Sequence, residues 1–174
     1  MRKFRVALAL IIAISCSAAL AAQKPIQKLL PASGFKGWSI VADSYAYGKE
    51  LGLTEIYDGG YKEYLDAGVI EAAKQMYQRK KVFADVTVHR MKSEASAKAF
   101  YAKQLKAAGK DAKAISRPWT GFTWTTGGSV YGHLSYGDYY VTTTLTSKDA
   151  AGAVALMQEV GGKIKGVKPS NKTR

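Results

Sequence analysis

Aromatic, hydroxyl and imidazole side chains alternate with other residues over the segment 129–146. The dipeptide Gly137-Asp138 in its middle is typical of a two-residue β-hairpin turn. Pairing across that turn sets Tyr136 opposite Tyr139, and the strand period of two then gathers the polar residues on one face. This face holds Tyr131, His133, Ser135, Tyr140, Thr142 and Thr144, and we expect Leu134, Val141 and Leu145 on the opposite, buried face.

The polar face has the composition of a binding surface. Aromatic rings supply contact area, and hydroxyl and imidazole groups fix the orientation of a sugar, a peptide or a ring-shaped ligand. A strand predicted over 82–91 adds His89 to the face if its mixed side turns the same way, and Trp119 and Trp124 could border it. The alternative is an ordinary half-exposed sheet face, because Thr and Tyr favour strands for packing reasons alone.

Signatures of catalytic, metal and cofactor sites, such as H-E-x-x-H, C-x-x-C or a phosphate-binding loop, are missing from the sequence. The stretch 127–131, GGSVY, approaches the serine-hydrolase elbow, but Tyr131 replaces its last glycine and two predicted strands meet there. Two histidines without an identified carboxylate partner make a poor site for a metal or haem iron. We therefore predict no catalytic residue, metal or cofactor, and keep as a weak alternative a hydrolase with His133 as its base.

The first residues predict export. A basic start, the apolar run 6–14 and the closing Ala19-Leu20-Ala21 are typical of a secretory signal peptide over residues 1–21, too short for a membrane span. The residues before Cys16 also resemble a bacterial lipobox, in which the cysteine is acylated. We expect a periplasmic protein, with a lipid-anchored envelope protein or a secreted protein as alternatives.

After the leader we expect a linker over 22–36, a single α+β domain over 37–162 and a basic mobile tail over 163–174. The whole chain has a formal net charge of +13, and the charge stays near +10 without the leader. Such a charge attracts anionic membranes or envelope polymers, and we predict no nucleic-acid partner for an exported chain. Without Cys16 the domain has no cysteine and therefore no disulfide.

Periodicity and turn residues predict an α+β fold in the order β-α-β-β-α-β-β-β-β-α. An antiparallel sheet of about six or seven strands would carry roughly three helices. Ser93 is a natural N-cap for the second helix, and Gly109 a natural end. We expect strands over 37–45, 69–78, 82–91, 112–117, 121–126, 129–136 and 139–146, and helices over 54–68, 94–108 and 148–162.

The first predicted helix contains two adjacent glycines, Gly59 and Gly60, each of which costs about 1 kcal/mol relative to alanine there. Tyr57 and Tyr64 flank them, and Gly60 falls on the same helical stripe. We interpret the four residues as a packing motif that brings the helix backbone close to the sheet. The alternative is a ligand that lies against bare backbone.

A series of short motifs runs through the chain: LP (30–31) and GW (37–38), IYDGG (56–60) and YL (64–65), AGV (67–69), VTVHRM (86–91), SEASA (93–97) with Phe100, and YYV (139–141). In these motifs the chain resembles a family of exported bacterial proteins, domain of unknown function 6599, over roughly residues 30–162. The resemblance implies an envelope protein with an α+β domain and no established activity. Tyrosine is common in that family at the position of His89, so the resemblance does not imply a shared ligand role for it.

These features predict an exported, non-enzymatic binding or accessory module of the bacterial envelope. It would use the Tyr/His/Thr face for a small ligand or a partner protein. The alternative is electrostatic attachment to an anionic membrane or envelope polymer through the basic surface and tail. The hydrolase is the second alternative.

Overall fold

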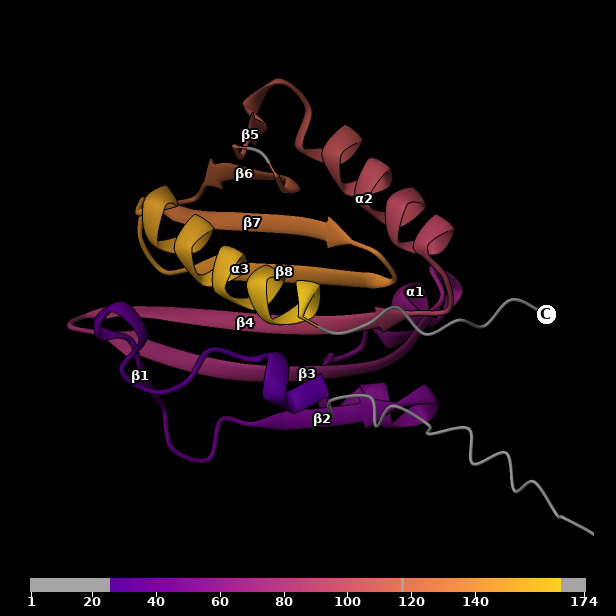
Figure 1. Cartoon of the computed structure of the whole chain (residues 1–174), viewed down its shortest axis with the longest axis horizontal. Helices are drawn as coiled ribbons and strands as arrows, with labels where there is room; N and C mark the ends of the chain where they lie inside the picture. Colours follow the sequence, from indigo (N-terminus) through magenta and orange to yellow (C-terminus); the bar gives the residue numbers. More distant parts are fainter. Residues whose placement is uncertain (1–25, 117, 167–174) are drawn as a thin grey trace, which may run out of the picture.

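The computed structural model describes residues 26–116 and 118–166. Its centre is an antiparallel sheet in the order β1-β3-β4-β8-β7-β6-β5, with β2 pairing β3 beside β1 (Figure 1). The predicted α+β class is confirmed. The strands are β1 (Ser39–Ile40), β2 (Ala46–Lys49), β3 (Val69–Arg79), β4 (Val82–Met91), β5 (Lys113–Ala114), β6 (Thr120–Thr126), β7 (Ser129–Tyr136) and β8 (Tyr139–Leu145).

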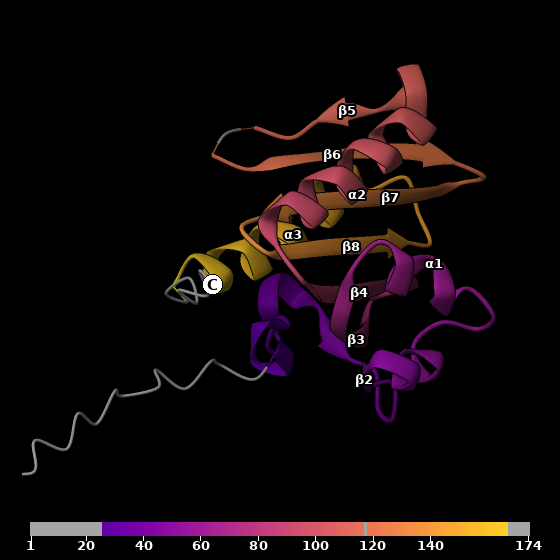
Figure 2. The same ribbon diagram turned by 90° about the vertical axis from the view of Figure 1, so that its right-hand side faces the viewer.

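Helices cover both faces of the sheet. On one face α3 (Ala150–Lys165) packs across β6, β7 and β8, and on the other α2 (Glu94–Ala108) lies beside the short α1 (Tyr61–Asp66) (Figure 2). Strand alternation assigns neighbouring residues of β8 to the two sides: Val141 packs with α3, and Tyr140 packs with α2. The sheet is therefore the middle layer between two apolar cores, which we call the α3 core and the α2 core.

The start and end of α2 follow from the residues predicted to set them. Ser93 Oγ accepts a hydrogen bond from the backbone N–H of Ser96 at 3.1 Å, which satisfies one of the free donors of the first turn. Gly109 ends the helix with φ at 60°, in the region that favours glycine. Both predictions are confirmed.

Two predicted elements are wrong in the first third of the chain. The strand expected over 37–45 is reduced to β1, and a turn in which Asp43 has a φ of 53° separates it from β2, which starts only at Ala46. The helix expected over 54–68 is broken into a 3-10 segment, η3 (Glu50–Glu55), and α1. Gly59 lies between them with φ at 78°, a left-handed conformation that a continuous helix does not contain.

The predicted linker over 22–36 is also wrong from Ile26 onward. A 3-10 turn, η1 (Ile26–Leu29), places Ile26, Leu29 and Leu30 in the α3 core, because residues three and four apart share one side of the turn. The Tyr77 hydroxyl donates to the carbonyl of Pro31 at 2.8 Å and fastens the segment to β3.

At the other end, α3 extends through residues 163–165, which the sequence had assigned to the tail. Lys163 Nζ donates to the carbonyl of Leu30 at 2.6 Å, and this hydrogen bond connects the end of α3 to the residue after η1. The remaining tail over 167–174, the signal peptide over 1–21 and Cys16 lie outside the described residues. Within residues 26–116 and 118–166, every helix is too short or too polar to span a bilayer.

Candidate functional site

The sheet register gathers the candidate ligand residues on the face toward α2. Each of three rows of side chains takes one residue from β4, one from β8 and one from β7. Successive rows stand two residues apart along the strands, so all three project from the same face. The rows are Asp85–Thr144–Tyr131, Thr87–Thr142–His133 and His89–Tyr140–Ser135.

One end of this face is covered, although both the predicted binding surface and its alternative, a half-exposed sheet face, assumed an exposed face. Phe100 of α2 packs edge-on against Tyr140, with ring centroids 4.9 Å apart, and both side chains belong to the α2 core. Tyr140 and His89 are fully buried, and His133 and Ser135 are buried as well. The open end retains the half-buried Tyr131, Thr142 and Thr144.

His89 is held by hydrogen bonds at both ring nitrogens. Its Nδ1–H donates to the backbone carbonyl of Tyr140 at 2.9 Å, which leaves Nε2 as an acceptor for the hydroxyl of Tyr57. Burial lowers the pKa of His89 from an ordinary 6.5 to about 4, and the bond to the Tyr140 carbonyl offsets only part of that effect. The ring is therefore neutral at pH 7, in one tautomer.

Tyr57 and Tyr64 form a lid over His89. Their rings stack with centroids 3.7 Å apart, and the ring of Tyr64 lies 5.6 Å from that of His89 and nearly parallel to it. Burial raises the pKa of Tyr57 well above its usual value, so its hydroxyl stays a donor.

The glycine packing motif is wrong as a statement about Gly59 and Gly60. Gly60 is the exposed N-cap of α1, and no atom lies within 4 Å of the Cβ positions of either glycine. The glycines instead make the turn that separates Tyr57 from α1, which carries Tyr64. Tyr57 and Tyr64 do contact each other, as the motif implied, but across a turn and not along one helix.

His133 belongs to a ladder of nearly parallel rings on β6 and β7. Its ring lies 4.8 Å from Phe122 and 5.0 Å from Trp124, and Trp124 lies 4.8 Å from Tyr131. Nδ1 of His133 and the hydroxyl of Tyr140 share a hydrogen bond. Burial, and then the nearby His89, lower the pKa of His133 to about 4, so this ring is also neutral at pH 7.

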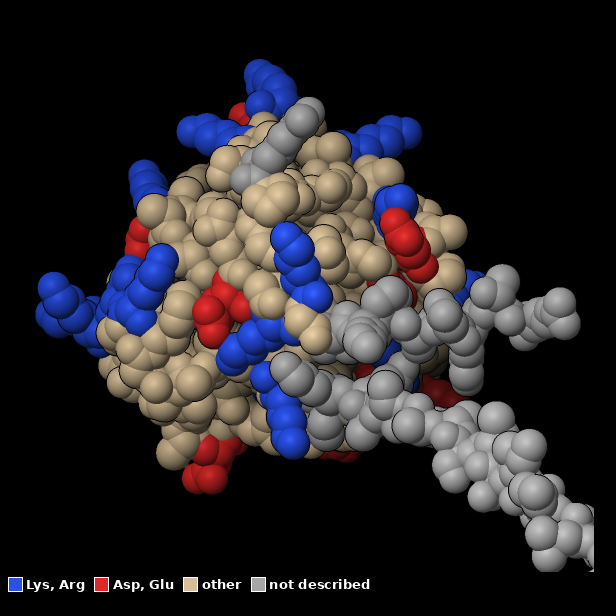
Figure 3. Space-filling view, viewed as in Figure 1, with Lys and Arg blue, Asp and Glu red and all other residues tan. Residues whose placement is uncertain are grey.

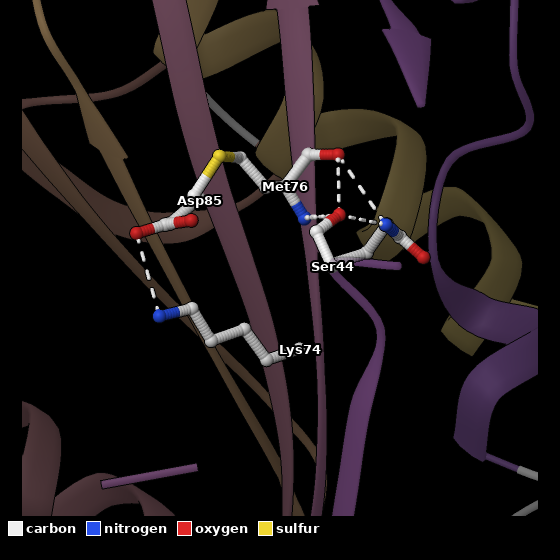
Figure 4. A network of polar contacts seen from close by, with 5 residues as sticks. Ser44, Lys74, Met76 and Asp85 are labelled. Atoms are coloured by element: carbon white, nitrogen blue, oxygen red, sulfur yellow. Dashed lines mark hydrogen bonds and ion pairs between the residues drawn. The ribbon is translucent and has the colours of Figure 1, made fainter. Parts of the chain in front are cut away.

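The last row at the open end of the face, which we call the open strip, crosses four strands. It consists of Asp85, Thr144, Tyr131 and Trp124. All four are half-buried. Asp85 Oδ2 lies 3.4 Å from Nζ of Lys74, and Figure 4 shows this pair facing each other across β3 and β4. The other oxygen, Oδ1, is buried and has no hydrogen-bond partner among the described residues.

Of the two tryptophans that were expected to border the face, only Trp124 lies on it. Trp124 belongs to the open strip, whereas Trp119 packs on the opposite side of the sheet, against Tyr136 and over Gly161 of α3. The lid over His89 was not foreseen from the sequence, because Tyr57 and His89 are 32 residues apart and no local pattern links them. Within the described residues no three His, Cys, Asp or Glu side chains lie close enough together to hold a metal ion.

Comparison with known proteins identifies the fold alone. No family model matches the chain, and no curated protein matches it. Among solved structures it is similar to the extracellular domain of PknH from Mycobacterium tuberculosis, with 13% sequence identity and a TM-score of 0.57. The match covers 80% of this chain and 94% of that domain.

Proposed function

We propose that this chain is an exported binding module that holds a hydroxyl- or amino-bearing ring, such as a saccharide, on the open strip. The observation that carries the proposal is the juxtaposition of the Asp85 carboxylate, whose side chain is 34% exposed, with the Tyr131–Trp124 ring pair in the same row. A partly exposed carboxylate accepts strong hydrogen bonds from a ligand hydroxyl or ammonium group.

The dimensions of the strip support a ligand longer than one ring. Neighbouring strands are about 4.8 Å apart, so the three steps from Asp85 on β4 to Trp124 on β6 span about 14 Å. That span suits a short oligosaccharide, which would lie over Thr144, contact Tyr131 with its apolar ring face and donate a hydroxyl to Asp85.

The buried half of the face is poorly placed for catalysis. Both histidines are neutral and buried; His89 is hydrogen-bonded at both ring nitrogens and His133 at Nδ1, so neither is placed as an exposed general base. Export is supported by the signal-peptide pattern and by the likeness to an extracellular domain. Periplasmic residence is the location we propose, with lipid anchoring through Cys16 as the alternative.

Attachment to anionic surfaces has less support. On the face that carries α3, Lys and Arg side chains are spread around the molecule and interspersed with acidic ones (Figure 3). No single basic patch stands out in that view, so the charge there favours solubility over a defined docking surface.

The test is an NMR titration of the ¹⁵N-labelled domain with chitotriose and with cellotriose. We expect shifts in the amides of β4, β7 and β8 at the open strip, and a several-fold weaker Kd for both Tyr131→Ala and Asp85→Asn. Tyr45→Ala is the matched control, because Tyr45 is an exposed aromatic residue beside β2, away from the strip. Binding that survives Tyr131→Ala and Asp85→Asn unchanged, or shifts confined to other surfaces, would refute the assignment.

A further inference from the structure

A concave surface, separate from the open strip, lies between α1 and α2. Figures 1 and 2 both place α1 beside α2. The groove has a volume of about 670 Å³, which falls within the range of small-molecule sites. It is distinct from the open strip, because it is formed by the helices that cover the opposite end of the same sheet face.

Two ion pairs build the walls of the groove. Lys103 of α2 reaches across to Glu63 of α1 at 2.8 Å, and Lys62 pairs with Asp66 along α1 at 2.8 Å. These contacts neutralise both acidic residues that line the groove. Lys92, the third cation of the lining, has no ion-pair partner in the described part of the chain, so it leaves one unbalanced positive charge.

The backbone positions Lys92 at the groove. Its N–H donates to the carbonyl of Gly68 at 2.7 Å, and a Cβ added at Gly68 would lie only 3.0 Å from Cδ and Cε of Lys92. The aliphatic stem therefore rests on bare glycine backbone, which leaves the ammonium group available to a ligand.

The floor of the groove is apolar and rigid. Phe100 lines it and is itself only 4% exposed. Its ring packs edge-on against Tyr64 at 5.6 Å and against Tyr140 at 4.9 Å, so the α2 core holds it in place. A small exposed patch of Phe100 beside one unpaired lysine combines an apolar contact with an anion contact.

We infer that this groove binds a small amphiphilic anion, with its acidic head on Lys92 and its apolar body against Phe100. A carboxylate and a phosphate share the chemistry that Lys92 recognises, and the test separates them. The inference is independent of the saccharide proposal, since the two sites share no residue.

The experiment uses two fluorescent probes with the same ring system. 8-Anilinonaphthalene-1-sulfonate carries the anionic group, and N-phenyl-1-naphthylamine lacks it. We expect the sulfonate to bind more tightly than the neutral probe, and Lys92→Gln to weaken its binding about five-fold, the loss of one partly exposed charge contact. Lys98→Gln is the control on the neighbouring helix α2, because Lys98 pairs with Glu94 and does not line the groove.

A second variant tests location without removing charge. Ala99 lines the groove and is exposed, so Ala99→Phe should fill the space and exclude the probe while the domain keeps its unfolding midpoint. Displacement of the probe by octyl phosphate or by octanoate identifies the head group that is preferred. The inference is overturned if Lys92→Gln binds like the parent chain, if Lys98→Gln loses as much affinity, or if neither amphiphile displaces the probe.

Discussion

Mild acid should destabilise this domain through its two buried histidines. The pKa of each of His89 and His133 falls from 6.5 to about 4 on folding, chiefly because burial disfavours the charged ring. Well above pH 6.5 both rings are neutral in the folded and in the unfolded chain, so the full stability is present. As the pH falls below 6.5, the unfolded chain takes up protons that the folded chain refuses, and stability declines until the pH reaches about 4.

The magnitude follows from these pKa values. Each histidine should remove about 2 kcal/mol of unfolding free energy at pH 5, and about 3 kcal/mol once the pH is below 4. Urea unfolding followed by tryptophan fluorescence at pH 7.5, 6 and 5 measures the decline. His133→Asn keeps a polar atom near the hydroxyl of Tyr140 but cannot titrate, so its loss of stability between pH 7.5 and pH 5 should be smaller by about 2 kcal/mol.

The carboxylates contribute an acid response of their own, so the pKa values need a direct measurement. Proton NMR of the ring Cε1–H signals provides it, and Lys98→His adds an exposed histidine as an internal standard that should titrate near 6.5. Signals of His89 and His133 that titrate together with this standard would refute the reasoning. So would a His133→Asn variant whose pH dependence matches that of the parent chain.

Two further changes test the lid and the glycines. Tyr57→Phe should cost about 1–3 kcal/mol of unfolding free energy, because Nε2 of His89 loses its hydrogen-bond donor. The loss of this bond to the neutral ring should also raise the pKa of His89. Unchanged stability and an unchanged pKa would contradict the lid. Gly132→Ala should destabilise by about 1–3 kcal/mol, because the new Cβ would lie 2.5 Å from Oγ1 of Thr143 and 2.6 Å from Cε of Met157, both of which are buried and hard to move aside. Gly60→Ala has open space and should be nearly neutral in the same urea melts. An equal loss from both glycine variants would contradict the packing described.

Residues with strong local signals were predictable, and residues governed by distant contacts were not. The bounds of β4, β7 and α2 agree with the predictions, since their alternation, turn residues and Ser93 cap all act within the element. The segment 37–68 was misread, because two short strands and two short helical segments leave no sustained period. Gly59 could be recognised as costly to a helix, but not as part of the turn that comes before α1.

The candidate face illustrates the same limit. Parity across Gly137-Asp138 placed the correct residues together, because the register follows from a two-residue turn. The burial of Tyr140 depends on Phe100, which is 40 residues earlier in the chain. Alternation along a strand assigns a side chain to a face, but it does not say which helix covers that face or how far the cover extends.

The burial of Ile26 also limits how far the domain can move from any anchor at its start. Only about ten residues separate Cys16 from Ile26, and at about 3.5 Å per residue they reach at most about 35 Å. A linker that continued to residue 36 would reach about twice as far. With Cys16 acylated, the domain would therefore stay within about 35 Å of the membrane surface. Both proposed sites would then meet only ligands present in that layer.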